Sequence, residues 1–300
     1  MPYKRRSPRR PSFRRRTYVK RRPRYVAKRR STIRRRRMPS KRSILNVTST
    51  KKRDNMPPEY VVADQPNNNG FAGGVALPAG SIPAGSTCHC VLFMPTARKS
   101  NPTDNAQQRQ NDVCFMKGYA EKVEMKSSTS SPWVWRRLVF TLKGDEIRDA
   151  LGPAQLHSPG NSYQRRMYLA SDGSTTGNNV QAALWNEIFE GSPGSDWLDV
   201  ITAKTSTKYV TFISDKTVIL RSGNDSGFVT HRRVYYPFNK NLVYDDKEVG
   251  SFATPNYYST DGKPGMGDAY VVDLFQPQGT DVDSGILNVQ MHATLYWHEK

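Results

Sequence analysis

The first 53 residues carry a charge density that prevents them from folding on their own. They contain 24 of the chain's 46 Lys and Arg residues and no Asp or Glu. Side chains of one sign repel one another, and too few apolar residues are present to offset the entropy lost on folding. Prolines such as Pro8, Pro11 and Pro23 also interrupt any helix. We therefore predict a disordered basic arm over residues 1–53.

The rest of the chain has the opposite charge balance. Residues 54–300 hold the other 22 basic residues and all 26 acidic residues, a formal charge of −4, although the whole chain is at +20. A body of that sign has no general attraction for a polyanion. We expect the arm to supply most of the electrostatic binding to nucleic acid.

The chemistry of the arm suits phosphate groups. Guanidinium groups match phosphate oxygens, and each phosphate contact releases counterions. The candidate nucleic-acid-binding residues are Arg5, Arg6, Arg9, Arg10, Arg14, Arg15, Arg16, Lys20, Arg21, Arg22, Arg24, Lys28, Arg29, Arg30, Arg34, Arg35, Arg36, Arg37, Lys41 and Arg42. Tyr18 and Tyr25 lie among them as candidate base-stacking partners. Nuclear import needs only about five to eight basic residues, so the arm is also expected to carry a nuclear localisation signal.

The remaining sequence predicts an all-β body. Residues 54–86, rich in Pro, Gly and Asn, are interpreted as an extended connector. Eight segments then show β-branched and aromatic enrichment, separated by turn residues. They are residues 87–94, 113–125, 132–143, 163–170, 208–222, 228–238, 269–275 and 286–297.

The last of these segments has the clearest period. Alternate residues from Leu287 to Trp297 are apolar, and the residues between them are mostly polar, as in a strand of an antiparallel sandwich. Val180–Gly191 reads as a single helix, with Asn178 or Asn179 as its N-cap. We predict an eight-stranded antiparallel jelly-roll sandwich over residues 87–300, with long loops and one short helix in a loop.

Arginine pairs interrupt three of the predicted strands. They are Arg136–Arg137, Arg165–Arg166 and Arg232–Arg233. Adjacent strand residues face opposite ways, so one of each pair is expected to meet solvent or nucleic acid. Trp133, Trp135 and Arg137 share a face, which predicts a subunit contact, a base-stacking surface or packing under a loop. Trp135 and Arg137 are therefore further candidate contacts on the body.

No motif in the sequence indicates catalysis, a metal or a cofactor. HExxH, GxSxG and a phosphate-binding GK[ST] loop are all missing, so we expect a protein that is not an enzyme and has no cofactor. Cys88, His89 and Cys90 could suggest zinc, but on a strand the histidine points away from both cysteines. The three cysteines are interpreted as small buried hydrophobic residues.

Several motifs resemble a known family. A Pro-punctuated Arg arm precedes the body, and the segments "SDKTVILRSGNDSG", "HRRVYYPFNKNLVYDD", "GDAYVVDLFQP" and "NVQMHATLYW" follow. This layout resembles the capsid (coat) proteins of small circular single-stranded DNA viruses, and in particular those of genomoviruses, which are related to geminiviruses. The resemblance covers the whole chain in layout and is most specific from residue 208 to residue 297.

The resemblance implies a structural protein of the virion. Its arm would package circular single-stranded DNA and engage the host nuclear import machinery, with assembly in the host nucleus and no membrane partner. About 60 copies would form a homo-oligomeric T=1 icosahedral shell. The alternative from another class is a cellular chromatin- or RNA-binding protein with a basic tail on a β-sandwich. The two hypotheses differ in whether the body self-assembles: a capsid protein should form shells, whereas the cellular protein should remain a monomer or small oligomer.

Overall fold

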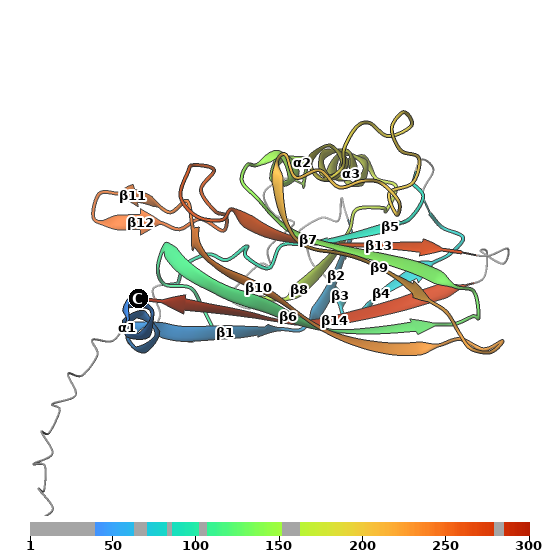
Figure 1. Cartoon of the computed structure of the whole chain (residues 1–300), viewed down its shortest axis with the longest axis horizontal. Coiled ribbons are helices and arrows are strands. Elements are labelled where there is room, and N and C mark those ends of the chain that lie inside the picture. Colours follow the sequence, from blue (N-terminus) through green and yellow to red (C-terminus); the bar gives the residue numbers. More distant parts are fainter. Residues whose placement is uncertain (1–39, 63–70, 83–85, 102–106, 152–162, 279–284) are drawn as a thin grey trace, which may run out of the picture.

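Two β-sheets packed face to face form the body, with helices against one side of the pair (Figure 1). The computed structural model describes residues 40–62, 71–82, 86–101, 107–151, 163–278 and 285–300. Within these ranges, none of the helices has the length and apolar character needed to cross a membrane. The predicted all-β sandwich is confirmed.

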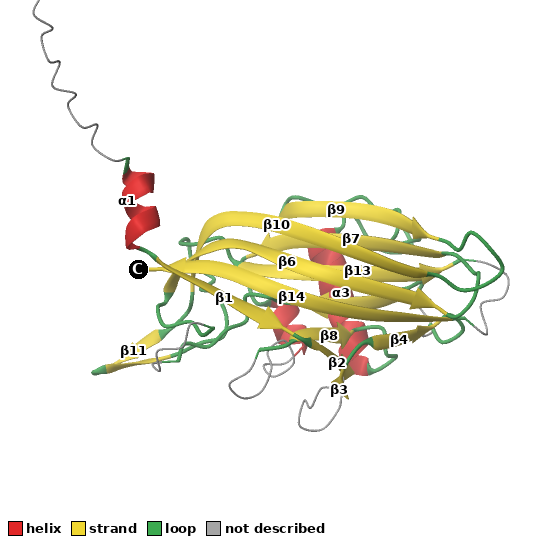
Figure 2. Ribbon diagram, turned by 90° about the horizontal axis from the view of Figure 1, so that it is seen from below, coloured by secondary structure: helices red, strands yellow, loops and turns green. Residues whose placement is uncertain are grey.

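The first sheet, which we call the arm-side sheet, is antiparallel throughout. Its main path is β1 (Thr50–Met56), β14 (Ile286–Glu299), β6 (Val113–Ser127) and β10 (Val229–Val243), and β4 (Val75–Pro78) also pairs with β14. Helix α1 (Lys41–Thr48) leads directly into β1. The described chain therefore enters the body at this sheet, close to the C-terminus (Figure 2).

The second sheet, which we call the helix-side sheet, has seven strands. In order they are β3 (Phe71–Ala72), β2 (Pro58–Val62), β8 (Arg165–Leu169), β5 (His89–Phe93), β13 (Asp268–Pro277), β7 (Trp133–Leu142) and β9 (Val210–Leu220). Only the β2–β8 pair is parallel among the described pairings. Helices α2 (Glu146–Leu151) and α3 (Thr175–Ile188) cover its outer side, and a hairpin of β11 (Lys247–Val249) and β12 (Phe252–Thr254) projects from the body (Figure 1).

The strand order identifies the sandwich as a jelly roll. Taking β4, β5, β6, β7, β9, β10, β13 and β14 as strands one to eight, the arm-side sheet runs 1-8-3-6 and the helix-side sheet 2-7-4-5. This interleaving of early and late strands in two sheets is the arrangement of a jelly roll. All eight predicted strands exist. However, the predicted strand at 163–170 is the additional strand β8, and strand one comes from the predicted connector.

The connector prediction for residues 54–86 was therefore wrong for much of that stretch. β1 pairs with residues 293–299 of β14, and β4 pairs with residues 286–289, so the two share one edge of the arm-side sheet. Between them the chain crosses to the other sheet and forms β2 and β3. Prolines occur here at strand ends and on outer strands, where a missing ladder N–H costs little.

The two sheets differ in how many of their faces are buried. In β14 the apolar residues from Leu287 to Trp297 alternate with more exposed ones, as predicted. β5 and β8 are buried at every position, and β7 and β13 at nearly every one, because the second sheet packs against the first on one side and against α2 and α3 on the other. The outer face of the arm-side sheet has no helix over it in the described chain (Figure 2).

Helix α3 begins five residues earlier than expected. Ser174, rather than Asn178 or Asn179, is its N-cap, and the Ser174 Oγ accepts a hydrogen bond from the Gly177 N–H at 2.9 Å. Val180, Leu184 and Ile188 are buried against the helix-side sheet. The N-cap differs because serine competes well with asparagine there, and the helix also ends three residues before the predicted Gly191.

Candidate nucleic-acid interface

The predicted binding residues divide between the arm and its junction with the body. Arg5 to Arg37, together with Tyr18 and Tyr25, lie outside the described residues. Lys41 and Arg42 are in helix α1, and the Lys41 side chain is exposed. Because α1 runs into β1, the basic arm is tethered to the arm-side sheet.

The last cations counted with the arm belong to a strand. Lys51, Lys52 and Arg53 are in β1, so the folded body begins before the predicted boundary at residue 53. Lys52 points inward, where its Nζ lies 3.2 Å from a Glu299 carboxylate oxygen and donates to the Gln108 carbonyl at 3.0 Å. Lys51 and Arg53 are exposed on the opposite face. Strand alternation thus separates a structural lysine from two cations that face solvent.

The outer face of the arm-side sheet, which we call the basic face, gathers lysine and arginine side chains from three strands. They are Lys51 and Arg53 of β1, Lys117, Lys122 and Lys126 of β6, and Arg233 of β10, with His231, His292 and His298 on the same face. Glu124 is the one carboxylate on this face within the described strands. The −4 average of the body therefore does not describe this surface.

Two of these cations lie directly opposite each other. Lys122 of β6 pairs in register with Arg233 of β10 on one side and with His292 of β14 on the other. Across the described part of the chain, no carboxylate is within ion-pair distance of Lys122 or Arg233. Facing like charges destabilise a sheet, whereas a bound polyanion would stabilise the same arrangement.

Glu124 neutralises only its nearest neighbours. Its carboxylate forms an ion pair with Lys126 and lies 3.5 Å from His231 Nδ1. The hydrogen bond from Lys126 lowers the pKa of Glu124, and the charges of Lys126, His231 and His292 act in the same direction. Glu124 is therefore ionised at neutral pH and offsets Lys126, while none of the other lysines and arginines of the basic face has a carboxylate partner among the described residues.

The opposite side of the body is acidic. The covering segments, residues 144–151 and 171–209, hold the carboxylates Asp145, Glu146, Asp149, Asp172, Glu187, Glu190, Asp196 and Asp199, against the cations Arg148, Lys204 and Lys208. We call these segments the acidic cover, which lies over the helix-side sheet (Figure 1). Positive and negative charge are thus separated across the sandwich, which orients the body toward a polyanion.

The body contacts proposed for Trp135 and Arg137 are contradicted by their burial. Both side chains lie between the two sheets, where Trp135 Nε1 donates to Asp273 Oδ1 at 2.8 Å. The shared face of β7 was predicted correctly, but it packs onto the arm-side sheet rather than facing out. The other face of β7 lies beneath the acidic cover. A strand that is buried on both faces cannot be distinguished from a half-exposed one by alternation.

Arg137 belongs to a buried cluster of four charges between the sheets. Arg137 Nε lies 2.5 Å from Asp273 Oδ1, and another of its nitrogens contacts Glu121. Arg165 Nε is 2.7 Å from Glu121 Oε1, and its Nη2 is 3.2 Å from Asp273 Oδ2. Burial by itself raises the pKa of Glu121, but Arg137 and Arg165 outweigh it, and the pKa is lowered. These four charges balance and connect β6, β7, β8 and β13.

The other predicted arginine pairs divide in the same way. Arg136 is buried and donates to Asp215, and Arg166 is buried with its Nε 2.7 Å from Glu59 Oε2. The expectation that one residue of each pair meets solvent was therefore wrong for the pairs at 136–137 and 165–166. In the third pair both Arg232 and Arg233 are exposed, because β10 is an edge strand.

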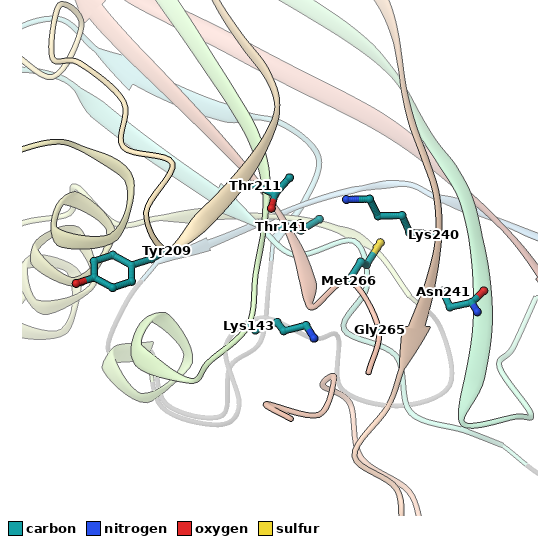
Figure 3. A pocket seen from close by; sticks show the side chains of 8 residues that line it. All are labelled: Thr141, Lys143, Tyr209, Thr211, Lys240, Asn241, Gly265 and Met266. Atoms are coloured by element: carbon teal, nitrogen blue, oxygen red, sulfur yellow. The ribbon is translucent and has the colours of Figure 1, made fainter. Parts of the chain in front are cut away.

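A cleft of about 490 Å³ opens between β9 and β10 (Figure 3). Lys143 and Lys240 contribute its two cations, and Tyr209 lies at its rim. Lys143 Nζ already donates to the carbonyls of Gly262, at 3.0 Å, and Pro264, at 3.3 Å, so it holds the neighbouring loop. The residues lining the cleft include no histidine, cysteine or carboxylate, and they offer no nucleophile–base pair.

The three thiols are buried and unbridged. Cys88 and Cys90 lie in the core beneath the acidic cover, and Cys114 lies between the sheets. Burial raises the pKa of each thiol, so all three are protonated at neutral pH. His89 points the other way, toward the Trp133 ring. Among the described residues, no group of three or more His, Cys, Asp or Glu side chains could hold a metal ion.

The chain shows little similarity to known proteins. No protein-family model matches it, and a search of curated proteins found no significant match. Among solved structures, it aligns with the VP1 pentamer of human polyomavirus 6 at 10% identity, over 84% of this chain and 95% of that chain, with a TM-score of 0.18. A variant VP1 pentamer of Washington University polyomavirus aligns at 10% identity over 87% and 97%, with a TM-score of 0.16. At such TM-scores the fold assignment rests on strand order alone.

Proposed function

We propose that the protein is a viral capsid protein that self-assembles into a shell and packages single-stranded DNA. The observation that carries the proposal is the joining of a long basic arm to the basic face of a jelly roll whose other side is acidic. The sequence resemblance to genomovirus capsid proteins supports the finer assignment, including circular DNA, a shell of about 60 copies and T=1 symmetry.

The charge separation gives the subunit an orientation in such a shell. The arm is joined through α1 to the sheet that carries the basic face, so both would line the interior and contact phosphates there. The acidic cover would then be turned away from the genome. Repulsion between that cover and DNA would keep nucleic acid from binding to the outside of the particle.

Assembly into a closed shell requires surfaces that a second copy can cover. The β11–β12 hairpin projects from the body and exposes Val249 and Phe252 (Figure 1). A two-stranded hairpin is only marginally stable alone, and exposed apolar side chains gain free energy when a neighbour covers them. These features support a homo-oligomeric partner for the chain.

The same arm supports a second, transient role. Basic runs of this length fit recognition by the host nuclear import machinery, so the protein would enter the nucleus for assembly and leave in the virion. The proposed role is structural and requires no catalysis, no cofactor and no membrane.

The test is to express the full chain and examine it by electron microscopy after nuclease treatment. Uniform shells containing nuclease-resistant DNA are the expected result. A monomer or small oligomer whose nucleic acid remains nuclease-sensitive would overturn the proposal and favour a cellular basic-tailed binding protein.

A deletion variant tests the division of labour. Removing residues 1–39 removes 19 of the 46 Lys and Arg residues and leaves α1 and both sheets in place. We expect the far-UV circular dichroism of the body to be kept and DNA retention to be lost. Equal retention by the deletion variant would refute the role of the arm.

A further inference from the structure

Four aromatic rings form a strip across the basic face. Tyr235 comes from β10, Phe115 from β6, and Tyr296 and His298 from β14, so three adjacent strands contribute. Phe115 and His298 are direct cross-strand partners, with ring centroids 5.8 Å apart. All four side chains are exposed or half-buried. We call this set the aromatic strip.

A glycine determines the orientation of the Tyr235 ring. A Cβ at Gly118 would lie 2.5 Å from the Tyr235 hydroxyl oxygen and 2.7 Å from its ring Cζ, so the ring lies over Gly118 on the sheet. The Tyr235 hydroxyl also reaches the Lys117 carbonyl at 3.4 Å. Half of the Tyr235 side chain remains exposed, at 50%. The ring is therefore held against the sheet on one side and open to solvent on the other.

The neighbouring rings extend this surface. Tyr296 is the register partner of Gly118, which places it next to the Tyr235 ring. Burial raises the pKa of Tyr235 and the nearby Tyr296 hydroxyl adds to the effect. Burial, followed by the charges of Lys51 and Lys117, lowers the pKa of His298, so its imidazole is neutral at neutral pH. Tyr235 and His298 therefore present uncharged rings at that pH.

Cations surround the strip on both sides. Lys51 is the register partner of His298, and Arg53 is the register partner of Tyr296. Toward the other end of the sheet, Arg233 is two residues from Tyr235, and Lys122 is the register partner of Arg233. Rings bordered by cations that have no carboxylate partner in the described part of the chain offer stacking for bases and charge for the phosphates that connect them.

We propose that the aromatic strip of the basic face stacks unpaired bases of single-stranded DNA. A duplex keeps its base faces inside the helix, so it can meet this sheet only through phosphates, whereas a single strand can lay its bases on the rings. The strip therefore selects single-stranded over double-stranded DNA. This inference rests on the proposed function for its partner, but it assigns base contacts to the folded body rather than to the arm.

The test uses the full chain in solution and oligodeoxythymidine that contains 5-iodouracil, which cross-links to stacked aromatic side chains on irradiation. Mass spectrometry should locate cross-links at Tyr235 or Tyr296 with the single strand and much fewer with a duplex of equal length. Cross-links confined to residues 1–39, or equal yields with the duplex, would overturn the proposal.

Affinity measurements at raised salt provide a second readout, because salt weakens the phosphate contacts of the arm more than it weakens stacking. The double variant Tyr235→Val, Tyr296→Val should bind the single strand at least about fivefold more weakly, while duplex affinity changes by less than about twofold. Equal losses for both probes would contradict base stacking.

A matched control is available on another part of the surface. Tyr209 is 54% exposed and has the Lys208 ammonium 4.7 Å from its ring centroid, but it lies at the start of β9 beside the cleft in Figure 3. Tyr209→Val should change neither probe's affinity, and a loss equal to that of the double variant would refute the assignment to the strip. Shells that protect DNA without cross-links at Tyr235 or Tyr296 would refute this inference alone. Cross-links without shells would refute the proposed function alone.

Discussion

Arg165 and Arg233 are both arginines on β-strands of the same sandwich, but their surroundings are opposite. Arg165 is fully buried between the sheets and is bound by Glu121 and Asp273. Arg233 is exposed on the basic face, opposite Lys122, with no carboxylate at ion-pair distance among the described residues. The first guanidinium connects protein elements, and the second is free to meet a phosphate.

This difference shows why net charge is a poor guide to binding. Several cations of the body are neutralised inside the protein, as in Arg137, Arg165 and Arg166, which are each paired with a carboxylate. Buried pairs are little affected by salt, whereas exposed cations are screened by it and exchange counterions for DNA. The −4 total coexists with a strongly basic face because the unpaired carboxylates of the described residues gather mainly on the acidic cover rather than on that face.

The largest expected effect comes from breaking the buried cluster. Arg165→Met leaves Arg137 as the one cation of the cluster against Glu121 and Asp273, so the free energy of unfolding should fall by about 3–5 kcal/mol. Urea denaturation measures this change. Arg221→Met, at an exposed position just after β9, is the matched control and should stay within about 0.5 kcal/mol. Equal effects of the two substitutions would mean that burial does not separate the two kinds of arginine.

A smaller loss of folding stability is expected when the pH is lowered. Burial raises the pKa of Glu121, but Arg137 and Arg165 lower it further, to below its ordinary value of 4.5. The unfolded chain then binds the proton more readily, so this contribution is complete above pH 4.5 and is lost as pH falls through the lowered pKa. One group contributes at most about 1.4 kcal/mol per pH unit.

The measurement is the free energy of unfolding as a function of pH for the natural chain and for Glu121→Gln. The variant should be less stable near neutrality, and the gap between the two should narrow below pH 4.5. A gap that stays constant down to strongly acidic pH would show that the ionised form of Glu121 is not what stabilises the cluster.

The smallest effect on stability, and the most specific effect on binding, is expected at the basic face. The double variant Lys122→Gln, Arg233→Gln should change the free energy of unfolding by less than about 1 kcal/mol, because both side chains are exposed. The slope of log affinity against log salt for single-stranded DNA should become shallower by about 0.7 for each phosphate that the variant no longer binds. The control is Lys204→Gln, on the acidic cover, which should leave the slope unchanged. A steeper or unaltered slope in the double variant would contradict binding of DNA at the basic face.

Part of the candidate site could be predicted from the sequence. The acid-free arm is evident from composition, and the alternation in β14 gave the correct buried set from Leu287 to Trp297. The basic face was missed because its cations were counted into an average. Lys122 and Glu124 occupy alternate positions of the strand predicted at 113–125, and Lys126 continues the alternation just beyond its predicted end, so this pattern would have placed them together on one outward face.

The sequence by itself determined that a long basic arm precedes an all-β body, because charge density and strand period are local properties of the chain. Only the tertiary structure decided which arginines remain available. Arg137 and Arg233 both follow another arginine in a strand, but β7 lies inside the helix-side sheet under the acidic cover, whereas β10 forms an edge of the uncovered sheet. Whether a cation is neutralised by a partner depends on residues more than one hundred positions away, such as Asp273 for Arg137, and strand order alone brings such residues together.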